Sequence, residues 1–223
     1  MARKFSLMAA LAMLCGLSFT VQAAPIILLD DTFDTENGGA GQLNYTSFTN
    51  WNVTDGSVDL IGNDFYDFYP GNGLYLDLDG STWSAGTLES KNLFALTPGD
   101  YELRFDLGGA ARTPGWWGAS DTVSISLGSL FNESFTLNYT DPLSTVIRNF
   151  SVTTSASERL IFEHAGGDMA GLILDNVRLS QVAPSPVPDP GTLFLLGSGL
   201  AGLALTRKRP RRGRELKGGG VAG

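Results

Sequence analysis

Apolar and polar residues alternate along much of the chain between positions 24 and 181. The clearest example runs from Tyr101 to Leu107, where every odd position is apolar and every even position is charged. Successive side chains of an extended strand point to opposite faces, so this pattern predicts a strand with one buried and one solvated face. A Thr-Pro-Gly-Asp tetrapeptide that begins at Thr97 predicts a turn just before it, because proline fixes φ and glycine accepts a positive φ.

Short segments rich in β-branched and aromatic residues recur between clusters of Gly, Asn, Asp and Pro. Such segments predict strands, because these side chains fit a pleated, half-buried surface. The predicted strands are Ile26–Leu29, Ser57–Ile61, Leu74–Leu78, Thr87–Phe94, Tyr101–Leu107, Thr122–Leu127, Glu133–Asn138, Arg148–Thr154, Arg159–His164 and Leu172–Leu179. About ten strands at this spacing predict an all-β passenger domain over residues 24–181, folded as a two-sheet sandwich.

The first 23 residues have the order of a secretory signal peptide. Arg3 and Lys4 precede an apolar run, Phe5–Phe19, and Ala23 provides a small residue at the expected cleavage point. Cys15 offers a lipoprotein alternative, in which the cysteine would be acylated and anchored. The bulky leucine before Cys15 fits a lipobox poorly, so we expect signal peptidase to cut after Ala23.

The C-terminal end also departs from a globular composition. Residues 182–190 contain four prolines and predict an extended linker, whereas residues 191–206 carry no charge. As a helix, these sixteen residues would be about 24 Å long, so we expect one membrane-spanning helix in a locally thinned bilayer. The tail 207–223 begins with the basic residues Arg207, Lys208, Arg209, Arg211 and Arg212. Because positive residues stay cytoplasmic, the passenger is expected on the far side of the inner membrane.

Charge and cysteine content exclude several functions for the mature domain. Residues 24–187 contain 21 acidic and 6 basic side chains, a net charge of −15. Such an excess repels nucleic acid and anionic lipid headgroups, so neither is expected as a partner of this region. The only cysteine lies in the signal peptide, so the mature domain has no disulfide and no thiolate for catalysis or metal binding.

The C-terminal motif Val187-Pro188-Asp189-Pro190, the apolar span and the Arg-rich tail together resemble the PEP-CTERM sorting signal. Asp189 stands where glutamate is usual, and the chain continues past the basic cluster to a glycine-rich end. The resemblance implies recognition and cleavage by an exosortase-type membrane protease. It also implies a cell-envelope, surface or extracellular-matrix location in a bacterium that makes exopolysaccharide. A plain single-span membrane anchor is the alternative.

Three segments of the passenger resemble the galactose-binding-like jelly roll that many carbohydrate-binding modules share. They are Asn50–Val53, Leu96–Tyr101 and Gly171–Leu179, and the last contains the Asp-Asn-Val element common in the final strand of that fold. The resemblance implies a jelly-roll form of the sandwich. Because a fold does not determine its ligand, sugar binding has to be argued from a site.

Arg112, Trp116 and Trp117 are the candidate ligand-binding residues. They lie in a Gly- and Pro-rich loop, Gly108–Gly118. Sugar rings pack their C–H faces on indole, and arginine donates to hydroxyl or carboxylate oxygens, so this loop predicts a polysaccharide site. A structural role, with one tryptophan capping the open end of the sandwich, is the alternative.

Asp30, Asp31 and Asp175 are the candidate ligands of a structural calcium ion. Calcium prefers oxygen ligands, and the jelly-roll resemblance implies a calcium site between the first and last strands, where these residues fall. The chain has no contiguous calcium-binding loop, so solvated turn carboxylates are the alternative.

No catalytic site is predicted. His164 is the only histidine, and it is expected at the end of a strand. The segment Thr82–Gly86 lacks the first glycine and the strand-to-helix context of a nucleophile elbow. We therefore expect a non-enzymatic protein with an adhesive or structural role in the envelope or biofilm matrix, and a carbohydrate-binding module is the alternative.

Overall fold

The alternating segment around Leu103 and Phe105 forms β7 (Gly99–Gly108), the longest described strand. Its apolar side chains are buried, and its charged side chains lie on the opposite face. β7 lies between β10 (Ser144–Val152) and β13 (Ile173–Gln181) and pairs with both in antiparallel register. The alternation therefore gives this sheet one face in the core and one face in solvent.

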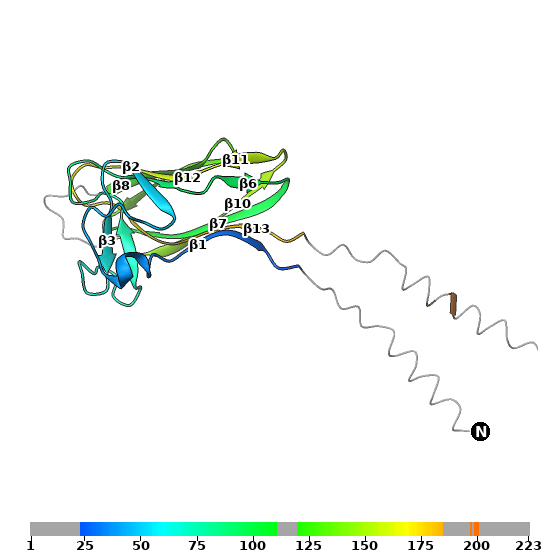
Figure 1. Ribbon diagram of the computed structural model, residues 1–223, viewed down its shortest axis with the longest axis horizontal. Coiled ribbons are helices and arrows are strands. Elements are labelled where there is room, and N and C mark those ends of the chain that lie inside the picture. The colour runs from blue at the N-terminus through cyan, green and yellow to red at the C-terminus, as the bar shows by residue number, and fades with distance from the viewer. Residues whose placement is uncertain (1–22, 111–119, 185–196, 198, 201–223) are drawn as a thin grey trace, which may run out of the picture. The chain divides into compact units, whose positions relative to one another are not determined.

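The computed structural model describes residues 23–110, 120–184, 197, 199 and 200. Within the compact unit Ala23–Pro184, two antiparallel sheets form two layers (Figure 1). The first sheet has the order β10-β7-β13-β4-β3, with β1 also paired to β13, and includes β1 (Ile26–Asp31), β3 (Asp59–Gly62) and β4 (Leu74–Asp77). The second has the order β2-β5-β12-β8-β9, from β2 (Trp51–Asp55), β5 (Thr87–Ser90), β12 (Leu160–Ala165), β8 (Ser120–Leu127) and β9 (Phe131–Asn138). A short ribbon pairs β6 (Phe94–Leu96) with β11 (Ala156–Glu158).

Aromatic side chains from both sheets meet between the layers. Trp51 of β2 packs edge-on against Phe162 of β12 with ring centroids 5.7 Å apart, and Phe162 packs against Phe105 of β7 at 5.8 Å. The indole N–H of Trp51 donates to the buried carboxylate of Asp31 at 2.9 Å, which satisfies its polar edge. The arrangement confirms the expected all-β, two-sheet jelly-roll sandwich.

One expected strand, Thr87–Phe94, is wrong as a single element. β5 ends at Ser90 and β6 begins only at Phe94. The break falls where the Lys91 N–H donates to the carbonyl of Asn50 at 2.8 Å. This bond holds the chain beside the start of β2, and the following residues leave the sheet for the β6–β11 ribbon.

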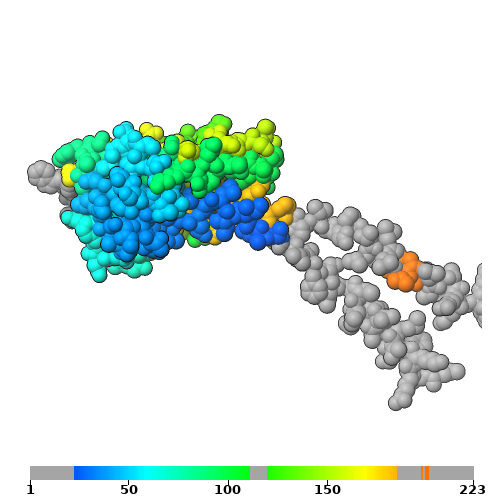
Figure 2. All heavy atoms as spheres, in the orientation of Figure 1, coloured from blue at the N-terminus to red at the C-terminus, as the bar shows by residue number. Residues whose placement is uncertain are grey.

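The long connection between β1 and β2 is tied to the sandwich by a buried side chain. It contains the short 3-10 helix η2 (Glu36–Gly39). Glu36 is 4% exposed and accepts the backbone N–H of Thr49 at 2.7 Å. Figure 2 shows the N-terminal residues of the domain, blue to cyan, covering much of the visible face.

The segments expected to flank the sandwich lie largely outside the described residues. Of the expected membrane-spanning segment 191–206, only Gly197, Gly199 and Leu200 are described, and all three are helical. Among the described residues, no helix is long and apolar enough to cross a membrane. The boundaries of the signal peptide (1–23), linker (182–190), span and basic tail stay predictions.

Candidate functional site

Trp83 is the most exposed large hydrophobic side chain in the part of the chain that the structure describes. It is 76% exposed and lies in the loop 78–86, between β4 and β5. The indoles of buried tryptophans fill cores, as Trp51 does here, so a nearly free indole is unusual. The loop that holds Trp83 is therefore a candidate ligand-binding loop.

The backbone on both sides of Trp83 is fixed by hydrogen bonds to Ser57 and to Asp59, the first residue of β3. The carboxylate of Asp59, 2% exposed, accepts from the N–H of Ser81 at 3.1 Å and from its hydroxyl at 2.6 Å. On the other side, the Ser57 N–H donates to the carbonyl of Ser84 at 3.0 Å. The loop thus presents the Trp83 indole from a braced backbone.

Two buried carboxylates hold the neighbouring loop, residues 166–171. One oxygen of Asp79 accepts from the N–H groups of Gly167 at 2.7 Å and Asp168 at 3.0 Å. One oxygen of Asp77 accepts from the N–H of Gly171 at 2.7 Å. A Cβ at Gly167 would lie 3.3 Å from the carbonyl oxygen of Trp83, so this loop passes directly beside the Trp83 loop.

His164 of β12 lies under the same loop and is 5% exposed. Its Nε2 accepts the backbone N–H of Leu172 at 3.1 Å, which assigns the proton of the neutral ring to Nδ1. Burial lowers the pKa of His164 to about 4, against the opposing effect of Asp79 and Asp168. The ring is therefore neutral at pH 7.

Two buried atoms at this place have no hydrogen-bond partner within the described residues. They are Nδ1 of His164 and the second carboxylate oxygen of Asp79. A Cβ at Gly166 would lie 2.9 Å from that nitrogen and 2.6 Å from the bonded oxygen of Asp79, so both side chains converge on this glycine.

Asp121 brings a further carboxylate from the start of β8. Burial, together with the charges of Asp168 and Asp79, raises the pKa of Asp121 to about 6. We call Trp83 together with Asp79, Asp121, His164 and Asp168 the Trp83 end of the sandwich. It combines an exposed apolar ring with hydrogen-bond acceptors, which is the chemistry that binds sugars.

The residues predicted to bind a ligand, Arg112, Trp116 and Trp117, lie outside the described residues. They precede β8 directly in the sequence, and Asp121 is the second residue of that strand. Their role as a binding site stays a prediction. Trp83 was missed by the sequence analysis, because a single tryptophan among serines and threonines has no periodic pattern to mark it.

The three predicted calcium ligands are not brought together as one set. Asp30 and Asp31 are consecutive on β1, so their side chains point to opposite faces, and Asp30 lies opposite Arg178. The buried carboxylate of Asp31 accepts the indole N–H of Trp51. Asp175 is also buried, and its burial raises its pKa to about 7. Within the described ranges, no group of three His, Cys, Asp or Glu side chains is placed to hold a metal ion. Calcium at these residues stays a prediction.

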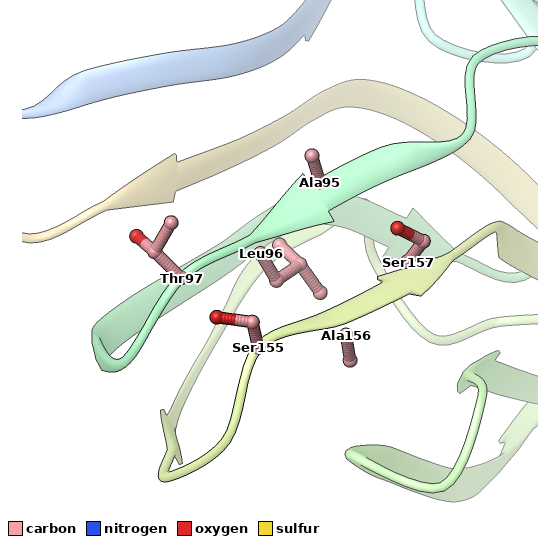
Figure 3. Close-up of a pocket in the computed structure, with 6 residues that line it drawn as sticks. All are labelled: Ala95, Leu96, Thr97, Ser155, Ala156 and Ser157. Carbon is pink, nitrogen blue, oxygen red and sulfur yellow. The ribbon is translucent and has the colours of Figure 1, made fainter.

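A pocket of about 240 Å³ lies on the β6–β11 ribbon (Figure 3). Its lining consists of Ala95, Leu96, Thr97, Ser155, Ala156 and Ser157. None of these side chains is charged or aromatic, so the pocket offers neither a stacking surface nor a strong hydrogen-bonding anchor.

The predicted sorting residues Val187, Pro188, Asp189 and Pro190 lie outside the described part of the structure, as does the basic cluster. Their identity rests on comparison with known families. Residues 186–209 match the PEP-CTERM protein-sorting motif. This match confirms the resemblance seen in the sequence, and it implies export and an envelope-associated location.

The sandwich is similar to solved carbohydrate-binding modules. The C-terminal family 6 module of the laminarinase LamC from Zobellia galactanivorans has 12% identity and a TM-score of 0.38, covering 62% of this chain and 97% of that chain. The CBM22-1 xylan-binding domain of Paenibacillus barcinonensis Xyn10C has 14% identity and a TM-score of 0.42, and the match covers 74% of this chain and 99% of that chain. TmCBM61, solved with β-1,4-galactotriose, has 13% identity and a TM-score of 0.41, covering 60% and 90%. These likenesses concern the fold and not the ligand. No curated protein matches the chain.

Proposed function

We propose that this is an exported, non-enzymatic envelope protein whose sandwich binds carbohydrate through the Trp83 end. Signal peptidase removes residues 1–23, and an exosortase-type membrane protease recognises the motif Val187–Pro190 in the C-terminal signal. Binding to a glycan then gives the protein an adhesive or structural role in the cell envelope or its surrounding matrix.

The exposed indole of Trp83 is the observation that carries the proposal. Removing a large apolar ring from water is favourable, and the C–H face of a sugar can pack against such a ring. The loop is already braced at Ser81 and Ser84, so binding would order little additional backbone. Such preorganisation lowers the entropic cost of association.

The carboxylates at the Trp83 end indicate a neutral sugar. Asp121 and Asp168 are partly exposed, and carboxylates accept hydrogen bonds from sugar hydroxyls. The same charges, in a domain of net charge −15, repel carboxylate or sulfate groups at this position. Neutral glucans, xylans and galactans are therefore the first ligands to test.

The experiment is calorimetric titration of the purified protein with oligosaccharides of these three neutral classes. Trp83→Ala should weaken binding about tenfold or more, the magnitude expected for loss of an aromatic anchor. The matched control is Leu93→Ala, which removes another exposed apolar side chain, 58% exposed, from the connection between β5 and β6. Equal affinity of Trp83→Ala and the unmodified protein would contradict the proposed site, and release of reducing ends would contradict the non-enzymatic role.

A further inference from the structure

The basic side chains of the sandwich fall into two groups. Five lie in the described residues, and three of these have hydrogen-bond or ion-pair partners. The partnered ones are Lys91, Arg148 and Arg159, which bond respectively to the Phe48 carbonyl, to Glu133 and to Glu89. Arg104 and Arg178 form no ion pair within the described part of the chain, although acidic residues outnumber basic ones throughout the domain.

These two arginines are direct cross-strand neighbours. Arg104 of β7 pairs in register with Arg178 of β13, at the middle of the six-stranded sheet. The flanking residues of both strands point into the core, so both arginines stand on the outer face. Side chains at such positions have Cβ atoms about 5 Å apart, which lets two guanidinium groups reach one bound group.

Like charges directly opposite each other on a sheet repel, and the carboxylate of Asp30, opposite Arg178, offsets only part of the repulsion between the two arginines. An anion bound between them would remove that repulsion and use their fixed, planar donors. We propose that Arg104 and Arg178 bind carboxylate or sulfate groups of an acidic polysaccharide on the outer face of the six-stranded sheet.

This site is separate from the Trp83 end. Arg178 follows Leu172, whose N–H binds His164 there, by six positions, which corresponds to about 20 Å along an extended chain. The two sites also differ in chemistry, since one presents an indole with carboxylates and the other presents two guanidinium groups. Either proposal can therefore fail without the other.

The carboxylates on the same face limit what the pair can bind. Glu102 and Asp106 flank Arg104 along β7, and Asp30 lies opposite Arg178. The carboxylate of Asp106 already accepts from Thr145 and from Asn176. These negative charges oppose long-range attraction, so affinity must come from direct bidentate contact. A polymer that presents many anionic groups compensates for weak single contacts by multivalency.

The test measures retention of the purified protein on immobilised polygalacturonate and on dextran sulfate at about 0.1 M salt, where the Debye length is about 10 Å. Binding to the first assigns a carboxylate ligand, and binding to the second a sulfate ligand. Arg104→Gln and Arg178→Gln should each weaken binding about tenfold, consistent with loss of a charge-assisted hydrogen bond. The control Arg159→Gln removes the same charge elsewhere and should bind normally.

The thermal unfolding midpoint provides the second readout. A merely structural role for either arginine would lower the midpoint on substitution, whereas relief of like-charge repulsion should leave it unchanged or raise it slightly. The proposal is overturned if the unmodified protein binds neither polymer. It is also overturned if Arg104→Gln and Arg178→Gln bind as well as Arg159→Gln does.

Discussion

The buried histidine at the Trp83 end makes stability depend on pH in a direction that can be calculated. The pKa of His164 is lowered to about 4 by burial, from an unfolded value of 6.5. Between these values the unfolded chain binds more protons than the folded one, so His164 makes stability fall as pH falls from 6.5 towards 4. Between pH 6.5 and pH 4, the contribution of His164 to the free energy of unfolding falls by about 3 kcal/mol.

His164→Gln removes the titration and keeps an acceptor for the N–H of Leu172. Stability is measured by urea unfolding of both proteins at about pH 7 and about pH 4.5, conditions that bracket most of the titration. We expect the free energy of unfolding of the unmodified protein to drop by about 2 kcal/mol more than that of the variant between these conditions.

The unmodified protein has to be compared with His164→Gln, because Asp121 changes the stability with pH in the opposite direction to His164. Its pKa is raised to about 6, so the fold is destabilised by its ionisation and gains stability as pH falls from 6 towards 3.8. The two effects partly cancel in the unmodified protein, and only the difference isolates His164. A difference that stays constant between the two pH values would refute the assignment of a buried neutral histidine.

Three further predictions follow from the same structure. Asp121→Asn should stabilise the fold above about pH 6, by about 1 kcal/mol after allowance for solvent screening, and should have no effect below about pH 4 in urea unfolding. Asp59→Ala leaves both Ser81 donors without their acceptor and should cost about 2 kcal/mol, together with faster protease cleavage in the loop 78–86. Intact mass of the protein from its native envelope should show a chain that begins at Ala24 and ends near 188–191, whereas a retained basic tail would contradict cleavage.

The strands predicted from sequence include β7, whose side chains alternate between core and solvent, and also β3 and β4, which are buried throughout. The first shows a period of two, and the other two are short runs rich in apolar residues. β2 was not predicted as a strand, because among its five residues only Trp51 is buried. The expected strand Thr87–Phe94 was too long, because the chain leaves β2 after Lys91 and pairs with β11 from Phe94, and no local pattern reports such a change of partner.

The candidate site was less predictable, because its parts are distant in sequence. Ser81 is held by Asp59, 22 positions away, and Asp79 binds the N–H of Gly167, 88 positions away. Composition indicated a sugar-binding tryptophan, but it directed attention to Trp116 and Trp117, which lie in a more conspicuous cluster. Exposure and backbone bracing single out Trp83, and both are properties of the folded chain.

The central claim is that a neutral glycan contacts the Trp83 indole, and residue-resolved NMR tests it most directly. The four tryptophan indole N–H signals of the ¹⁵N-labelled protein would be followed during titration with an oligosaccharide that binds, with Trp83→Phe for assignment. The account predicts a saturable shift of the Trp83 signal, while the buried Trp51 signal, bonded to Asp31, stays fixed. Saturable binding with an unmoved Trp83 signal would contradict it.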